Sequence, residues 1–302
     1  MRTFCLIALL ATAPAAPALA DIVVRDDTGQ SIRLAQPARR IVSLSPHITE
    51  NLFAIGAGER VVGTVDFSNY PEAAKAIPRV GGYEKVDLEA VAALRPDLVI
   101  AWESGNIASH VAKLKAIGLP LLLTDSKRIE DVPADLERLG EVTGIRNSAR
   151  AVAAAFRDRL AALRSRYSAR PRVATFYEVW NQPLMTVGGG QVISDALHLC
   201  GGDNVFGGLR QMAAQVSVEA VLAANPEAIV ASGMGDARPE WLDDWRRWPA
   251  LTAVARDNLF FVPPDHLQRN TPRILDGIER LCVHLETARA RRPTVNPANP
   301  AR

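Results

Sequence analysis

The serines and histidines of this sequence do not form an arrangement that supports nucleophilic catalysis. Ser43 and Ser45 lie close to His47, but the chain has no G-x-S-x-G segment that would present a nucleophile at a sharp turn. Ser45 directly precedes Pro46, which is typical of a helix start with serine as N-cap and proline in the first turn. We therefore expect no hydrolase-type site here, and no enzyme.

Two further patterns fall short of a cofactor site or a metal site. Gly188, Gly189 and Gly190 precede an expected helix, but Ile193 occupies the third glycine position of a dinucleotide-binding fingerprint. The histidines show neither H-E-x-x-H nor paired spacing, so we expect no dedicated metal cage and no cofactor. His266 follows an expected strand and is the histidine of most interest for ligand contact, although a surface position explains it more simply.

Aromatic side chains are placed where expected strands end or helices begin. Ligands of open α/β sheets bind at the carboxyl ends of strands, and rigid aromatic faces there supply contact area at low entropic cost. This placement predicts a large, flat, partly apolar ligand, with local core packing as the alternative, most clearly for Tyr70 and Tyr177. The aromatic residues at such positions are Phe67, Tyr70, Tyr83, Trp102, Tyr177 and Trp180.

Residues 1–20 have the pattern of a cleaved signal peptide. Arg2 precedes an apolar stretch, and Ala18-Leu19-Ala20 forms the small-residue cleavage site. Pro14 and Pro17 interrupt the segment, which argues against a membrane anchor. We therefore expect a soluble protein of the periplasm.

Composition and cysteine usage fit this location. The 302 residues are enough for two hydrophobic cores. The 35 Lys and Arg nearly balance the 33 Asp and Glu, and no basic stripe suggests nucleic acid as a partner. Loss of Cys5 with the leader leaves Cys200 and Cys282, which we expect to pair in an oxidising compartment; two buried free thiols are the alternative.

Strand and helix patterns alternate in two series, which predicts parallel βαβ units and an α/β fold. Between the series, Val152, Phe156, Leu160 and Leu163 recur at helical spacing in a stretch without glycine or proline. The expected segments are a signal peptide at 1–20, a hairpin at 21–38, a first lobe at 39–145, a linking helix at 146–170, a second lobe at 171–290 and a disordered tail at 291–302.

The two series also resemble each other. Residues 86–99 match 216–229 at Val, Glu, Ala and Pro positions, and 48–52 match 193–197 more loosely. Two diverged copies of one domain would give this pattern, and chance similarity of amphipathic helices is the alternative.

Several segments together resemble the class III periplasmic substrate-binding proteins of ABC importers. The resemblance covers about residues 39–285 and implies two Rossmann-like lobes joined by a single long rigid α-helix, with a ligand cleft between the lobes. It implies a non-enzymatic monomer that delivers a small metal chelate to an inner-membrane ABC permease with its ATPase subunits. The segments are Arg40-Ile41-Val42-Ser43-Leu44-Ser45-Pro46, Val80-Gly81-Gly82-Tyr83 before Asp87-Leu88-Glu89, Arg95 to Trp102, Cys200-Gly201-Gly202 and Thr271-Pro272-Arg273.

Within this family, the corrinoid-binding members offer the nearest pocket pattern, which implies cobalamin or a related corrinoid as the ligand. Haem or a ferric siderophore is the alternative, and a tyrosine ligand to haem iron would come from Tyr70, Tyr83 or Tyr177. Met185 replaces a Phe of those members, and Ala213 replaces a Trp. Trp180 is a candidate to supply the aromatic surface that these two replacements remove. The ligand-binding residues that this resemblance and the residue patterns suggest are Phe67, Tyr83, Trp102, Trp180, Met185, Asp265, His266 and Arg269.

Glu89 and Glu219 occupy equivalent positions in the internal repeat, each near the start of an expected helix. The resemblance implies that they dock the two lobes into basic pockets of the permease. The alternative is that each carboxylate only complements its helix dipole.

Overall fold

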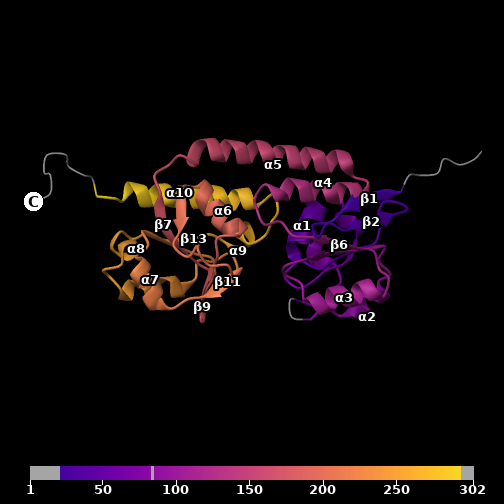
Figure 1. Cartoon of the computed structure of the whole chain (residues 1–302), viewed down its shortest axis with the longest axis horizontal. Helices are drawn as coiled ribbons and strands as arrows, with labels where there is room; N and C mark the ends of the chain where they lie inside the picture. Colours follow the sequence, from indigo (N-terminus) through magenta and orange to yellow (C-terminus); the bar gives the residue numbers. More distant parts are fainter. Residues whose placement is uncertain (1–20, 83–84, 294–302) are drawn as a thin grey trace, which may run out of the picture.

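The computed structural model describes residues 21–82 and 85–293 and contains two α/β lobes beneath one long helix, α5 (Arg146–Tyr167) (Figure 1). The expected signal peptide, Tyr83 and residues 294–302 of the expected tail lie outside the described residues. No helix in the described ranges combines the length and apolar character needed to cross a membrane.

The first lobe is built on a parallel four-stranded sheet in the order β4-β3-β5-β6. Its strands are almost continuously apolar because helices cover both faces of the sheet, as in most parallel sheets. The strands are β3 (Ile41–Ser43), β4 (Val61–Gly63), β5 (Leu98–Trp102) and β6 (Leu121–Thr124). The helices are α1 (Pro46–Ala54), α2 (Leu88–Ala93), α3 (Ala108–Ala116) and α4 (Asp131–Thr143), with short 3-10 turns η1 (Gly58–Arg60) and η2 (Glu72–Ala76).

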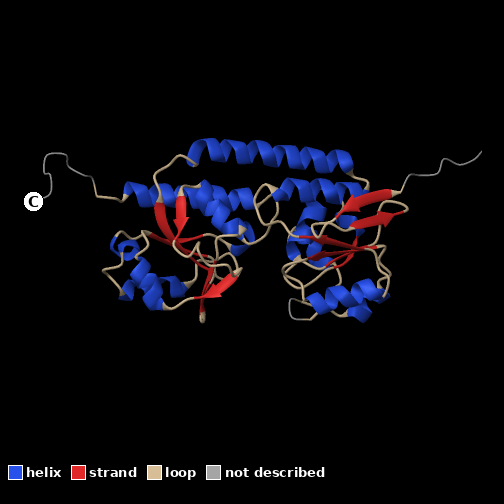
Figure 2. Cartoon of the chain, viewed as in Figure 1, coloured by secondary structure: helices blue, strands red, loops and turns tan. Residues whose placement is uncertain are grey.

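The second lobe repeats this plan with a parallel sheet in the order β10-β7-β12-β13 (Figure 2). Its strands are β7 (Val173–Glu178), β10 (Gly202–Asn204), β12 (Ala228–Ala231) and β13 (Leu259–Phe261). Its helices are α6 (Val192–Leu199), α7 (Val218–Ala224), the 3-10 helix η3 (Glu240–Arg247), α8 (Thr252–Ala255), α9 (Pro264–Leu267) and α10 (Ile274–Ala290).

Both sheets have the same order when their strands are numbered along the chain: second, first, third, fourth. In both lobes the third strand follows a helix of the sequence repeat, α2 before β5 and α7 before β12. The weak internal similarity of the sequence therefore corresponds to a repeated architecture.

The second lobe carries a small antiparallel sheet that the sequence analysis did not anticipate. Its order is β11-β9-β8, with β8 (Trp180–Asn181), β9 (Leu184–Val187) and β11 (Ala213–Gln215). The strands are too short to show a period along the sequence, and β11 joins β9 from across α6 and β10. These strands place the loop before β11 at the rim of the second lobe.

The expected hairpin consists of β1 (Ile22–Arg25) and β2 (Ser31–Leu34), paired antiparallel. It lies against the first lobe, where the Asp27 carboxylate accepts a hydrogen bond from the backbone N–H of Asp125 at 2.6 Å and pairs with Arg138 at 2.7 Å. The hairpin therefore supports the chain directly after β6.

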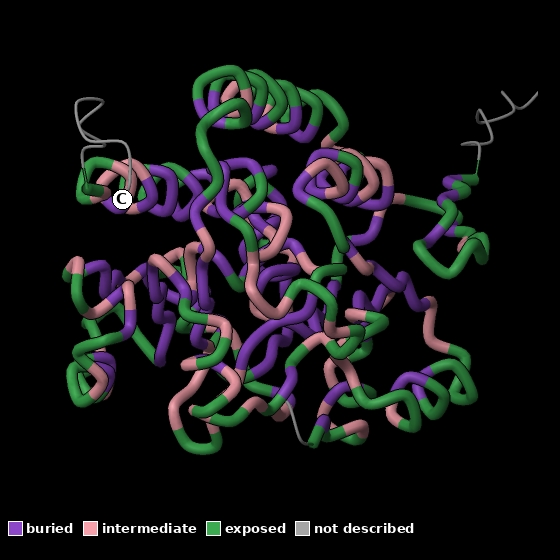
Figure 3. Tube along the Cα trace, turned by 60° about the vertical axis from the view of Figure 1, so that its left-hand side comes forward, coloured by how far each residue is buried: buried purple, intermediate pink, exposed green. Residues whose placement is uncertain are grey.

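Helix α5 has one buried side and one side exposed to solvent (Figure 3). Ala149, Ala153, Phe156 and Leu160 recur at spacings of three and four residues on the buried side. They belong to one apolar cluster that includes Ile41 in the first lobe and residues of α10 in the second. The two lobes thus share a continuous core beneath α5.

A disulfide joins Cys200 and Cys282, as expected, with a Cα separation of 4.7 Å. Cys200 caps the end of α6 and Cys282 lies in the middle of α10, and both are fully buried. The bond therefore joins α10 covalently to the end of α6 within the second lobe.

Candidate ligand-binding cleft

A cavity of about 550 Å³ lies between the lobes at the carboxyl ends of the strands. The first lobe contributes residues that follow β5 and β6, and the second contributes the start of α6, the loop before β11 and the segment after α9. Most lining side chains are apolar or are neutral amides and hydroxyls. The lining residues are Trp102, Ser104, Asp125, Ser126, Lys127, Val179, Val187, Gly190, Gln191, Val192, Ile193, Arg210, Met212, Ala213, Leu267, Gln268 and Asn270.

Trp102 presents a half-buried indole to this cavity, and its surroundings fix the ring. The indole Nε1–H donates to Asp125 Oδ1 at 3.1 Å, and the backbone N–H donates to Asn106 Oδ1 at 2.7 Å. A Cβ atom at Gly105 would lie only 1.8 Å from the ring, so the missing side chain is what lets the indole pack there. The His47 ring meets Trp102 edge to face at a centroid distance of 5.4 Å.

His47 is a neutral neighbour of Trp102. Burial, followed by the positive charge of Arg269, lowers the pKa of His47 to about 4. Its Nδ1 is hydrogen bonded to Ser45 Oγ at 2.7 Å. Ser45 occupies the expected N-cap position of α1, but its side chain bonds to this imidazole and does not cap the helix. The expectation of a serine cap was therefore wrong in its side-chain contact.

Arg269 and Asp265 lie at the boundary between the lobes. Arg269 is 8% exposed and pairs with Asp265 at 2.8 Å, and its Nη2–H donates to the backbone carbonyl of Phe67 in the first lobe at 2.9 Å. Burial raises the pKa of Asp265 against the opposing effect of Arg269. Three of the expected site residues are thereby brought together.

Phe67 has an unusual backbone for an aromatic residue. Its φ angle is 63°, in the left-handed region that non-glycine residues seldom adopt, and its side chain is 65% exposed. Backbone strain of this kind concentrates at functional sites. The hydrogen bond from Arg269 to its carbonyl helps to hold this conformation.

Of the expected ligand residues that the structure describes, Trp102 lines the cavity. The others do not: Phe67, Trp180, Met185, Asp265, His266 and Arg269. The Trp180 indole packs edge to face on Trp241 at 6.4 Å and donates to the Gln182 carbonyl at 2.9 Å. Met185 lies in β9 as the register partner of Trp180, and His266 lies in the short helix α9. Ala213 does line the cavity; it is the residue that stands where the corrinoid-binding members have Trp.

The described tyrosines considered as iron ligands are engaged elsewhere. Tyr177 is fully buried in the core of the second lobe, so it cannot reach a ligand in the cleft. The Tyr70 ring is covered by the Arg273 guanidinium, 3.6 Å from its centroid. Tyr83 lies outside the described residues.

Sequence reasoning missed several polar residues of the cavity. Asp125 directly follows β6 and accepts hydrogen bonds from both Trp102 and Ser104. Its position at the carboxyl end of a parallel strand is the same signal that pointed to the aromatic residues, so Asp125 could have been predicted in the same way. Gln268 and Asn270 adjoin Arg269, but their direction toward the cavity follows from the turn after α9 and not from any local pattern.

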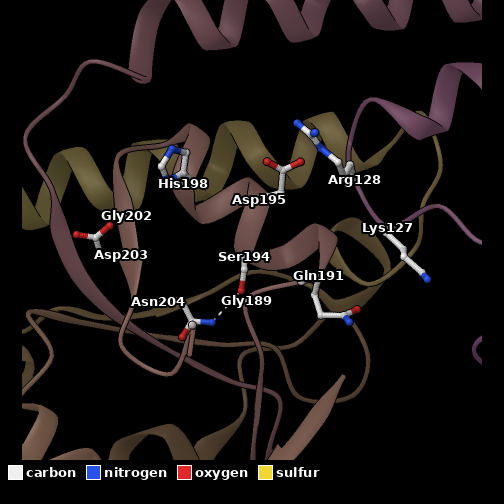
Figure 4. Close-up of a pocket in the computed structure, with 12 residues that line it drawn as sticks. Lys127, Arg128, Gly189, Gln191, Ser194, Asp195, His198, Gly202, Asp203 and Asn204 are labelled. Carbon is white, nitrogen blue, oxygen red and sulfur yellow. Dashed lines mark hydrogen bonds between the residues drawn. The ribbon is translucent and has the colours of Figure 1, made fainter. Parts of the chain in front are cut away.

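A second cavity, of about 570 Å³, adjoins the first and shares Lys127, Gly190 and Gln191 with it. Lys127 and Arg128 approach it from the first lobe, while Asp195, His198 and Asn204 come from the second (Figure 4). A Cβ at Gly188 or Gly189 would collide with backbone carbonyls of residues 207–211, whereas Gly190 faces open space. Close backbone packing therefore explains the first two of these glycines.

Glu89 and Glu219 are both exposed in the first turns of α2 and α7. The two helices lie on the side of the molecule opposite α5 (Figure 1). The pKa of Glu219 is lowered by hydrogen bonds from its own backbone N–H and from Ser217. Both carboxylates are accessible to a partner approaching that side.

Within the described ranges, no group of three or more His, Cys, Asp or Glu side chains could hold a metal ion. The residues that line the cleft offer an aromatic surface and hydrogen-bonding groups.

The family model for periplasmic binding proteins matches residues 41–266. This chain belongs to the periplasmic binding protein family. The vitamin B12-binding protein of Vibrio parahaemolyticus is 34% identical over 260 residues, covering 85% of this chain and 93% of that protein. The vitamin B12-binding protein of Yersinia pestis is 34% identical over 251 residues, covering 83% and 88% of the respective chains.

Solved structures agree with this assignment. The crystal structure of the periplasmic vitamin B12-binding protein BtuF of Vibrio cholerae matches with a TM-score of 0.79 at 33% identity, covering 84% of this chain and 98% of that one. A periplasmic haem-binding protein from Roseiflexus shares the fold at a TM-score of 0.72 and 24% identity, covering 83% and 99% of the respective chains.

Membership in this family confirms the expected fold and the expected non-enzymatic role. The chain is a non-enzymatic solute-binding protein with the two-lobed α/β fold that the sequence suggested. The family implies a small-molecule ligand and an ABC transporter as the partner.

Proposed function

We propose that this protein captures cobalamin or a related corrinoid in the cleft between its lobes and delivers it to an ABC importer of the inner membrane. The observation that carries the proposal is the immobilised Trp102 on a cavity edged by Ser104, Gln191, Gln268 and Asn270. A corrin ring is broad and flat, and it carries amide side chains at its edge. An aromatic face with amide and hydroxyl neighbours complements both features.

The charges of the cavity favour this ligand over an anionic chelate. Arg210 is the arginine among the lining residues, while Lys127 pairs with Asp125 at 3.2 Å. Arg269 is already engaged by Asp265 and the Phe67 carbonyl. A ferric siderophore of high negative charge would find few uncommitted cations here.

Cavity size supports a ligand larger than a typical drug. Drug-sized ligands occupy pockets of roughly 300–1,000 Å³. The cleft cavity of about 550 Å³ adjoins a second cavity of about 570 Å³, and Lys127, Gly190 and Gln191 line both. A corrinoid with its nucleotide tail is a bulky ligand that would use such a divided space.

The test is a ligand panel with the purified, leaderless protein. Titration calorimetry with cyanocobalamin, haemin and ferric hydroxamate should show saturable one-to-one binding with cyanocobalamin alone, and the bound complex should keep the corrin absorbance through gel filtration. Binding of haemin without cyanocobalamin would reject the proposal and favour a haem carrier on the same scaffold.

Delivery is proposed to use Glu89 and Glu219 as the docking groups. Their exposure, their equivalent positions in the repeat and their common side of the molecule support this role. Symmetric carboxylates suit a permease built around a two-fold axis. The signal peptide expected at residues 1–20 would bring the protein to the periplasm, where such a permease is accessible.

A further inference from the structure

The segment from Arg269 to Arg273, between α9 and α10, crosses from the second lobe to α1 of the first. Its anchor is Glu50, a carboxylate that is only 2% exposed. Arg273 binds both oxygens of Glu50, with Nε to Oε1 and Nη2 to Oε2 each at 2.7 Å. Thr271 Oγ1 donates to Oε1 at 2.6 Å, and Arg269 Nη1 lies 3.6 Å from Oε2. We call these four residues the Glu50 cluster.

The geometry of the Glu50 cluster constrains orientation as well as distance. A bidentate pair of arginine and carboxylate fixes the relative angle of the two planar groups. The Tyr70 ring, also from the first lobe, covers the Arg273 guanidinium at 3.6 Å, so this side chain is held between two groups of the opposite lobe. Because a buried carboxylate is unfavourable without its partners, the cluster is stable only while both lobes contribute.

The Glu50 cluster is connected directly to the cleft. Arg269 donates to the Phe67 carbonyl, as described above. Asn51, next to Glu50, donates to the Asn270 carbonyl at 3.0 Å, and the Asn270 side chain donates to the Ser126 carbonyl at 2.8 Å. Asn270 and Ser126 line the cavity, so a displacement of the cluster would move both walls of the cleft.

The internal repeat provides a built-in comparison. Asp195 on α6 occupies the position that Glu50 occupies on α1, since 48–52 match 193–197. Asp195 also reaches the opposite lobe, where its Oδ2 accepts a hydrogen bond from the backbone N–H of Ile129 at 3.1 Å. It points toward the first-lobe segment that carries Arg128 (Figure 4). The Asp195 contact is half-buried and has one neutral donor, so it is weaker than the contact of Glu50 with its charged donors.

We infer that Glu50 is a positioning residue: through Arg269, Thr271 and Arg273 it sets the relative orientation of the lobes and holds Asn270 in place on the cleft. The contact of Asp195 on the opposite edge contributes little to this orientation. The effect on ligand binding rests on the proposed function, whereas the orientation of the lobes does not.

The test compares Glu50→Gln with Asp195→Asn, two isosteric substitutions at equivalent positions. Nitroxide labels at Ala93→Cys and Ala223→Cys, exposed and equivalent on α2 and α7, report the distance between the lobes by pulsed electron spin resonance in the ligand-free protein. We expect Glu50→Gln to broaden or shift the distance distribution and Asp195→Asn to leave it as in wild type. Arg273→Lys, which keeps the charge but loses the bidentate geometry, should give a smaller change of the same kind.

Ligand kinetics provide the second measurement. Dissociation of cyanocobalamin should be roughly tenfold faster in Glu50→Gln than in wild type, the effect of losing one charge-assisted hydrogen bond. If folded Glu50→Gln and Arg273→Lys show only a lower Tm, with unchanged interlobe distances, the positioning role is rejected. If wild type binds no cobalamin, the proposed function fails while the distance measurement still decides this inference.

Discussion

Trp102 meets the cleft with an indole whose position is set by contacts to Asp125, Gly105 and His47. A ring held in this way loses little conformational entropy when a ligand packs against it. The aromatic surface of the first lobe is therefore available before binding, which favours affinity.

Replacement of Trp102 by Ala should weaken cyanocobalamin binding by about 1–3 kcal/mol, because a large buried aromatic contact is lost. Titration calorimetry measures the change. Trp180→Ala is the matched control, since Trp180 packs on Trp241 and does not line the cavity, and its affinity should stay near wild type. Equal losses in both variants would contradict this placement of the ligand.

Gly105→Ala offers an independent check, because the added Cβ would overlap the Trp102 ring while removing no group from the cavity. We expect weaker binding in this variant together with an altered fluorescence of Trp102.

Glu178 is a buried acid at the end of β7 with a role in stability. It is 1% exposed and accepts a hydrogen bond from the Trp245 indole at 2.8 Å. Burial raises its pKa from the ordinary value of 4.5 to about 8, so the folded protein keeps this carboxyl protonated at neutral pH. In the unfolded chain this carboxyl releases its proton. The free energy of the unfolded state therefore falls relative to that of the folded state as the pH rises.

This linkage predicts the sign of a pH effect. The contribution of Glu178 to stability is fully present below about pH 4.5 and is lost as the pH rises to about 8. Glu178→Gln keeps an acceptor for Trp245 without the titration, so it should raise stability at pH 7 by up to about 3 kcal/mol. Urea unfolding at pH 5 and pH 7.5 measures this; an equal effect at both pH values would show that Glu178 is ionised in the folded state.

At the scale of elements, the disulfide between Cys282 and Cys200 links α10 to the end of α6 within the second lobe. The bond closes a loop with a sequence separation of 82 residues, which includes α7, β12 and β13. Because α10 also packs against α5 and α6, the bond stabilises the half of the shared core that belongs to the second lobe.

Denatured, unreduced mature protein should contain no titratable thiol. The variant with Cys200→Ala and Cys282→Ala should lose about 4.5 kcal/mol of unfolding free energy, the amount that chain entropy predicts for a loop of this length. Urea unfolding gives the difference. Two reactive thiols in the unreduced protein would contradict the pairing.

At the scale of the whole molecule, two lobes of one architecture present α2 and α7 on a common side. Glu89 and Glu219 extend from the first turns of these helices. Under the proposed function, ligand capture in the cleft is thereby separate from docking through Glu89 and Glu219.

Variants with Glu89→Lys and Glu219→Lys should therefore bind ligand like wild type but deliver it poorly. Uptake into liposomes that contain the cognate permease should fall at least about tenfold for the double variant, because like charges at an interface are strongly unfavourable. Glu59→Lys, another exposed acidic position of the first lobe, is the control. Normal uptake by the double variant would reject docking, and a parallel loss of affinity would place these residues in the ligand site.

Much of the fold could be predicted because local patterns report burial. Apolar strands alternating with amphipathic helices led to two α/β lobes, and the spacing of Phe156, Leu160 and Leu163 led to the long helix α5. The position of Trp102 at the end of β5 was enough to place it at the cleft, since carboxyl ends of parallel strands converge there. The pairing of Cys200 with Cys282 was expected because these two cysteines lie outside the predicted signal peptide, and the structure confirms it.

Other features were decided only by the tertiary structure. Glu50 and Arg273 are 223 positions apart, and no local periodicity can relate a side chain of α1 to the segment before α10. Likewise, β11 pairs with β9 across an intervening helix and strand, and Ser45 bonds to His47 once burial keeps that imidazole neutral. The sequence alone determined which faces are apolar and hence the two lobes. The placement of one lobe against the other, which creates the cleft and the Glu50 cluster, depends on packing beneath α5 and on loop lengths that no short pattern encodes.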